Sequence, residues 1–140
     1  MTVLTFKLNE KLYLRDPQHT RLGQHIIRGS SEMIARLGFE HFTFKKLAKE
    51  IDSTEASVYR YFENKHRLLQ YLVAWYWSWL NYRIDLATSS LPNTREKLKA
   101  ALHVIAEEKK YDPMFQFVNV EALYRIVVAE LEFFVSVWKT

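Results

Sequence analysis

Apolar residues recur every three or four positions along most of this chain, the spacing that places them on one face of an α-helix. The first such series follows Asp16 and Pro17, which favour a helix start, and ends before Gly38, which favours a helix end. We therefore expect a helix over residues 17–37. Residues 3–14 instead hold two short apolar runs, a pattern that leaves a small hairpin and an extended arm as alternatives.

Two shorter helices are predicted next. Thr43 can cap a helix over residues 44–51, and Thr54 can cap a helix over residues 55–62. Asp52 lies between them, in a segment short enough to be a tight turn. Two short helices joined in this way form a helix-turn-helix.

The remaining pattern is helical as well. Asn64 can cap a long fourth helix that runs to about residue 87, Thr94 can cap a fifth helix, and residues 118–138 predict a last one. Because the chain has only 3 Gly and 3 Pro in 140 residues, it has little material for β-turns. We expect an all-α fold in which a three-helix N-terminal domain is joined by the fourth helix to a second helical domain.

The predicted boundaries divide the chain into three parts. Residues 1–16 form an N-terminal arm, residues 17–66 form the helix-turn-helix domain, and residues 67–140 form the second domain.

Composition excludes several classes of protein. Without cysteine the chain is neither a disulfide-stabilised secreted domain nor a thiolate metal site, and a reduced cytoplasmic location fits best. The most apolar stretch, residues 68–80, is interrupted by Gln70 and Ser78 and is shorter than the roughly 20 residues that span a bilayer, so no membrane partner is expected. No HExxH, P-loop or GxGxxG motif occurs, and we expect no enzymatic activity, no cofactor and no metal.

Charge is distributed unevenly. Residues 1–67 hold 12 Lys and Arg against 8 Asp and Glu, whereas residues 68–140 hold 8 of each, so the excess of +4 lies in the first half. Neutralising phosphates supplies most non-specific affinity for nucleic acid. The asymmetry therefore indicates either a polyanion-binding front half or a slightly basic solvated surface.

The predicted helix over residues 55–62 has two unlike sides. Val58 and Phe62 lie on one side and form an apolar anchor. The opposite side holds small, polar and basic residues: Ala56, Ser57, Tyr59 and Arg60. A helix of this length fits the DNA major groove, where Arg can bind guanine and Glu55 can accept from cytosine, although Glu55 is equally well explained by the helix dipole. Donors for flanking phosphates surround it: Thr43, Lys45, Lys46, Tyr59, Tyr61, Lys65, His66 and Arg67.

Residues 38–69, GFEHFTFKKLAKEIDSTEASVYRYFENKHRLL, resemble the DNA-binding segment of TetR-family transcriptional regulators. The family commonly has glycine where this chain has Asp52, a residue that tolerates the same backbone region. The resemblance implies a homodimeric one-component regulator, usually a repressor, that binds operator DNA and is released when its C-terminal domain binds a small molecule. It implies DNA contacts at nine residues: Thr43, Lys45, Glu55, Ala56, Ser57, Tyr59 and Arg60, with Tyr61 and Lys65 at phosphates.

The second half is rich in aromatic residues, which by spacing alone predict a helical core. The resemblance implies instead that some line a chamber for a hydrophobic or aromatic inducer: Trp75, Trp79, Tyr82, Phe115 and Tyr124. Family members are usually longer, with two further C-terminal helices in the dimer. We therefore expect this chain to be incomplete and residues 118–138 to expose a large apolar patch; the alternative is an unusually short member that uses its last helix as the dimer interface. A protein-interaction adaptor that keeps the fold without binding DNA is the alternative function.

Overall fold

The computed structural model describes residues 4–139, with the side chains of residues 134, 138 and 139 outside the described set. The described chain is all-helical, as predicted, and contains no strand. Its helices are α1 (Arg21–Leu37), α2 (Phe44–Glu50), α3 (Glu55–Tyr59), α4 (Lys65–Thr88), α5 (Thr94–Ala106) and α6 (Val120–Lys139). Four short 3-10 turns accompany them: η1 (Glu10–Leu12), η2 (Pro17–His19), η3 (Phe39–His41) and η4 (Pro113–Phe115).

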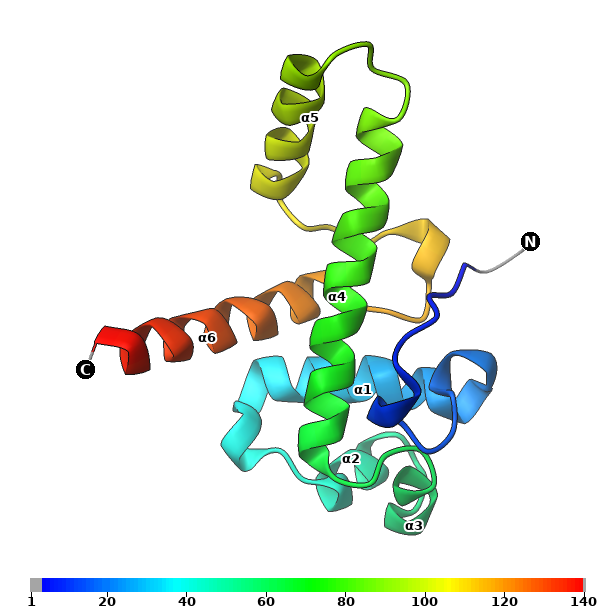
Figure 1. The fold of residues 1–140 in the computed structure, drawn as a ribbon. Coiled ribbons are helices and arrows are strands. Elements are labelled where there is room, and N and C mark those ends of the chain that lie inside the picture. The colour runs from blue at the N-terminus through cyan, green and yellow to red at the C-terminus, as the bar shows by residue number, and fades with distance from the viewer. Residues whose placement is uncertain (1–3, 140) are drawn as a thin grey trace.

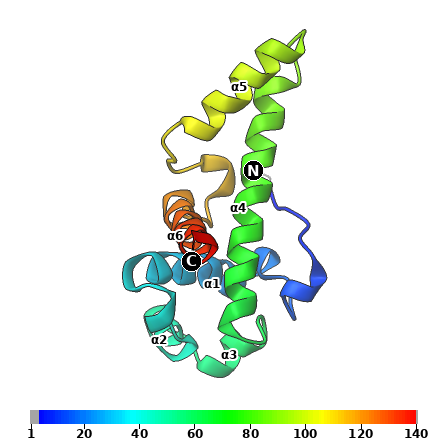
Figure 2. The same cartoon turned by 60° about the vertical axis from the view of Figure 1, so that its left-hand side comes forward.

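Helix α4 is the long axis of the molecule (Figure 1). Helices α1, α2 and α3 gather at its N-terminal end, and α5 runs back alongside its C-terminal end. Helix α6 packs against both α1 and α4, and its distal half projects away from the other helices (Figures 1 and 2). The two predicted helical regions are thus joined through α4 and through the contact of α6 with α1.

The first helix begins later than predicted. Asp16 does act as a cap, but of the turn η2, where its carboxylate accepts from the backbone N–H of Gln18 at 2.9 Å. Thr20 then caps α1 by accepting from the N–H of Gly23 at 3.0 Å. A side chain on Gly23 would collide with the backbone of Pro17, so this close approach of η2 to α1 requires glycine.

Two other boundaries also differ from the prediction. Asn93 caps α5 in place of Thr94, because its side-chain oxygen accepts from the N–H of Glu96 at 2.9 Å. Helix α3 ends at Tyr59 and continues as a turn in which the N–H groups of Tyr61 and Phe62 both donate to the carbonyl of Val58.

The N-terminal segment is an extended arm and not a hairpin. Val3, at the start of the predicted runs, lies outside the described residues; Leu8 is buried and Phe6 packs edge-on against Trp75 of α4. The N–H of Phe6 donates to the Gln18 side-chain oxygen at 3.0 Å, and the Gln18 amide donates back to the Phe6 carbonyl. The arm is therefore fastened along α4 (Figure 1).

One continuous core joins both halves of the chain. Phe62, Tyr71, Trp75 and Phe115 are among its largest fully buried side chains. Within the described residues, no helix combines the length and apolar character needed to cross a bilayer.

Candidate nucleic-acid interface

Helix α2 is held at its N-terminus by Thr43, whose hydroxyl accepts from the N–H of Lys46 at 3.1 Å. Phe44 and Leu47 are buried against the core, and Lys45 is exposed on the opposite side. This alternation follows from the helical repeat of the sequence. It leaves the cap hydroxyl of Thr43 and the ammonium of Lys45 at the surface.

The turn after α2 uses a left-handed residue. Asp52 has φ of 54°, in the region that aspartate tolerates better than most residues. The N–H of Ser53 then donates to the carbonyl of Ala48 at 2.8 Å and closes the turn. The substitution of Asp52 for the glycine common in the family therefore preserves the turn.

Helix α3 has the two sides that the sequence predicts. Val58 and Phe62 are both 0% exposed. Ala56, Tyr59 and Arg60 are exposed to solvent on the other side, and Tyr59 is 48% exposed. The short helix is thus anchored by one side and free to meet a ligand with the other.

Contacts with neighbouring residues orient the side chains on this outer side. The ring of Tyr59 packs edge-on against that of Phe44, with ring centroids 4.8 Å apart, so α2 supports it. The hydroxyl of Ser57 lies 2.8 Å from that of Thr54, the N-cap. Glu55 is exposed in the first turn of α3, where the helix dipole favours a carboxylate.

Two predicted phosphate donors lie in different surroundings from those expected. Tyr61 is 2% exposed, and its hydroxyl forms a 2.7 Å hydrogen bond with the hydroxyl of Thr20. The ammonium of Lys65 donates to the carbonyls of Phe39 and Phe42 at 2.9 and 3.2 Å and lies 4.5 Å from the Phe39 ring centroid. Both groups use their hydrogen-bonding capacity inside the domain, where they hold the helices in place.

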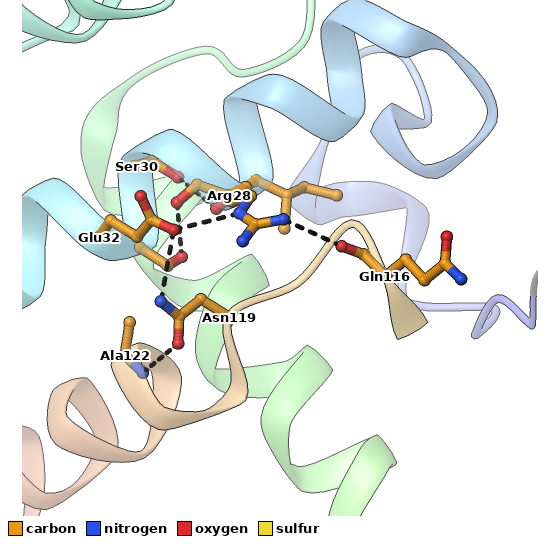
Figure 3. Close-up of polar contacts among 8 residues, drawn as sticks. Arg28, Ser30, Glu32, Gln116, Asn119 and Ala122 are labelled. Atoms are coloured by element: carbon orange, nitrogen blue, oxygen red, sulfur yellow. Dashed lines mark hydrogen bonds and ion pairs between the residues drawn. The ribbon is translucent and has the colours of Figure 1, made fainter. Parts of the chain in front are cut away.

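A polar junction connects this domain to the second half of the chain (Figure 3). Glu32 of α1 accepts from Arg28 at 3.2 Å and from the side-chain amide of Asn119 at 3.3 Å. Asn119 also accepts from the N–H of Ala122, in the first turn of α6, at 3.0 Å, and Arg28 donates to the carbonyl of Gln116 at 3.2 Å. The start of α6 is therefore fixed on α1 by side-chain hydrogen bonds.

The five residues predicted to line a ligand chamber fall into separate places. Trp75 and Phe115 are fully buried, with ring centroids 5.3 Å apart, and Tyr82 packs edge-on against Phe115 at 5.7 Å. Trp79 lines a cavity of about 200 Å³, whereas Tyr124 lines a different one of about 330 Å³. Three of the five thus pack against each other and the other two face separate polar hollows.

The hollow beside Trp79 is charged. Arg83 and Glu107 form a 2.8 Å ion pair across it, and Asp112 accepts from the Trp79 indole N–H at 2.9 Å. In the second hollow, the ammonium of Lys109 donates to the carbonyl of Val104 at 2.8 Å, and burial lowers the pKa of this lysine.

A buried tyrosine adjoins this region. Burial raises the pKa of Tyr76 to about 12, and the nearby Tyr124 adds to the shift. No group of three or more potential metal ligands occurs among the described residues.

The sequence interpretation missed several residues that shape the site. Gln18 joins the arm to Trp75, whose indole N–H donates to its side-chain oxygen at 3.2 Å. Glu32 and Asn119 form the junction, although they are 87 residues apart. Capping preference was the available signal for Asn119, because the pattern places it just before an apolar helical series.

These features define a class of protein: a helix-turn-helix protein whose third helix has an exposed outer side, joined to a second helical region. A sequence model of the bacterial regulatory proteins of the tetR family matches residues 26–72, which span most of α1, all of α2 and α3, and the start of α4. Residues 26–72 are therefore a TetR-family helix-turn-helix domain, and the resemblance inferred from the sequence is confirmed.

One curated relative extends this comparison. The chain is 26% identical over 95 residues to the nucleoid occlusion factor SlmA of Vibrio campbellii. The alignment covers 67% of this chain and 48% of that protein, so the chain spans about half the length of the relative it matches. No solved structure matches the chain.

Proposed function

We propose that this chain is a cytoplasmic transcriptional repressor that binds operator DNA as a homodimer and is released by a small hydrophobic or aromatic ligand. The observation that carries the proposal is the two-sided burial of α3. Val58 and Phe62 are fully buried, whereas Tyr59 and Arg60 are exposed and free of any ion pair within the described residues. In an adaptor without DNA binding, nothing requires the exposed side of α3 to carry an unpaired arginine.

The proposed base contacts come from the outer side of α3. Arg60 offers two donors to a guanine edge, Ala56 lets the backbone approach the base pairs closely, and Ser57 and Glu55 meet neighbouring bases. Thr43 and Lys45 then bind phosphates on the α2 side, which positions the helix without reading the sequence. Tyr61 and Lys65 contribute indirectly, since both hold the domain together.

Homodimerisation is supported by the distal half of α6. Leu131 and Val135, one helical turn apart, are 50% and 46% exposed on a helix segment that projects from the molecule, and Phe133, on another side of this segment, is 69% exposed. An exposed apolar surface of this kind is typical of an association site. In the DNA-bound dimer the two α3 helices should lie about 34–36 Å apart, one turn of B-DNA.

Ligand release is supported by the way the aromatic cluster and the junction are connected. Trp75 and Phe115 lie in the core between α4 and the segment leading to α6, and Asn119, the residue before α6, is bonded to Glu32 of α1. A ligand that enters among these rings must move the start of α6, and α1 with it. Release of DNA then follows because α1 packs against α2.

The decisive experiment selects duplexes from a random pool and measures affinity against salt. We expect a recovered sequence with twofold symmetry, and binding of a random duplex whose log affinity falls steeply with log salt, at about 0.9 per neutralised phosphate. Recovery of no sequence, together with salt-independent binding, would favour the adaptor. The relative is named a nucleoid occlusion factor, and that name describes the relative alone. Mapping the DNA sites that this chain occupies across a chromosome would show whether it binds one operator or many sites.

A sedimentation experiment tests the dimer. Leu131→Lys should produce monomers, because a charge on the proposed interface must be desolvated. Leu98→Lys on α5 is the matched control, since Leu98 is 59% exposed but lies on another helix. Monomers from neither variant, or from both, would contradict the assignment of the interface to α6.

A further inference from the structure

The N-terminal arm reaches the end of the recognition helix. The backbone N–H of Leu14 donates to the carbonyl of Tyr61 at 2.8 Å, and Tyr61 directly follows Arg60. In Figure 1 the arm descends beside α4 toward the end of the molecule that holds α3, and in Figure 2 it bends outward from α4 before it reaches that end. A segment remote in sequence from the helix-turn-helix is therefore part of its surface.

The next residue of the arm, Arg15, carries an available charge at this place. Arg15 is exposed, and its guanidinium carbon lies 5.3 Å from the ring centroid of Tyr61. It forms no ion pair within the described part of the chain. The adjacent Asp16 is bound instead to His19, at 3.3 Å, and to the N–H of Gln18.

The arm is held on both sides of Arg15. Upstream, Phe6 packs on Trp75 and exchanges hydrogen bonds with Gln18; downstream, Asp16 caps η2. A side chain on a fastened segment loses less conformational entropy on binding than one on a free tail. The backbone that carries Arg15 is therefore held in place before any ligand binds.

We propose that Arg15 binds a phosphate of the DNA strand that borders α3, so that the arm is a third element of the DNA interface beside α2 and α3. A helix in the major groove has a phosphate backbone on each side, and α2 with Lys45 serves one of them. Arg15 lies over the ring of Tyr61, just beyond the C-terminal end of α3, and its planar guanidinium matches a phosphate with two parallel hydrogen bonds. The inference rests on the proposed function and adds a contact to it.

The test compares Arg15→Gln with Arg95→Gln in the full chain. Arg95 is an exposed arginine of α5, at the far end of the molecule from α3. Affinity for a fixed-sequence 30-base-pair duplex is measured by fluorescence anisotropy between about 50 and 200 mM KCl. With one phosphate contact removed, the slope of log affinity against log salt should be smaller in magnitude by about 0.9 for Arg15→Gln. Over this fourfold range of salt, the factor by which its affinity declines should therefore be about 3.5 times smaller than for the unmodified chain. Arg95→Gln should keep the unmodified slope.

A second measurement separates phosphate contact from packing on Tyr61. The chain has no cysteine, so Arg15→Cys and Arg95→Cys each provide one attachment point for an iron chelate that cleaves nearby DNA. We expect cleavage of the duplex from position 15, and none from position 95. Arg15→Lys should restore the salt slope, since it restores the charge.

The outcomes distinguish this inference from the proposed function. If Arg60→Ala weakens binding while Arg15→Gln keeps the unmodified slope and the probe at position 15 leaves the duplex intact, the arm is not part of the interface and the proposed function stands. If the unmodified chain shows no salt-dependent binding of any duplex, both are wrong.

Discussion

Replacing Lys65 with methionine tests whether this lysine holds the domain together or binds DNA. Its ammonium donates to the carbonyls of Phe39 and Phe42 and lies over the Phe39 ring. Lys65→Met keeps an unbranched apolar side chain but removes the charge and the three donors. The carbonyls of Phe39 and Phe42 then lose this donor, and that of Phe39 keeps only the bond from the N–H of Phe42.

The expected loss of stability follows from these contacts. A hydrogen bond from a charged group contributes about 1.5–3 kcal/mol, and an exposed cation–π contact about 0.5–1 kcal/mol. Lys65 is only half-buried, so water can replace part of what is lost. We expect the free energy of unfolding to fall by about 1–3 kcal/mol, which lowers the urea midpoint by about 0.5–1.5 M for an m-value near 2 kcal/mol/M.

Lys45→Met is the matched control for urea denaturation followed by circular dichroism. Lys45 is exposed on α2, so its replacement should change stability by no more than about 0.5 kcal/mol. The magnitude of its DNA salt slope should instead fall by about 0.9, because the proposed phosphate contact of Lys45 is lost. If both variants have the same urea midpoint, the structural role of Lys65 is wrong.

Three further changes probe the recognition helix and the core. Arg60→Ala should weaken binding of the selected duplex by about 1–3 kcal/mol and relax the preference at one base pair, as measured by anisotropy on single-base variants. Phe62→Ala removes a fully buried ring and should lower stability by about 3–5 kcal/mol in thermal unfolding. Burial raises the pKa of Tyr76 to about 12, whereas the unfolded chain ionises near 10, so stability is intact below about pH 10 and declines toward pH 12. Tyr76→Phe should make that decline shallower in urea unfolding at pH 9–11.5.

Local chemistry was sufficient to predict the helix-turn-helix. Thr43 and Thr54 cap their helices as their side chains and positions suggest, and Asp52 adopts the left-handed turn. The burial of Val58 and Phe62 follows from the helical repeat alone. These signals act within a few residues, and a single sequence displays them directly.

Contacts between distant residues were not predictable in this way. Tyr61 is bound to Thr20, 41 residues earlier, and Leu14 is bound to the carbonyl of Tyr61. Neither pairing produces a periodic pattern, since each depends on where η2 and the arm pack once α1 and α4 have come together. For the same reason the sequence does not distinguish a hairpin from an extended arm over residues 3–14.

Donor type alone therefore does not assign a residue to DNA. Lys45 and Lys65 are the same amino acid at the first turns of two helices, yet Lys65 faces two backbone carbonyls and Lys45 faces solvent. Under the proposed function, removing either weakens DNA binding, one through loss of the proposed phosphate contact and the other through displacement of α2. Only the first mechanism lowers the salt slope, because only it changes the number of counterions released. The slope, more than the affinity, is thus the quantity that separates residues that touch DNA from residues that hold the reading helix in place.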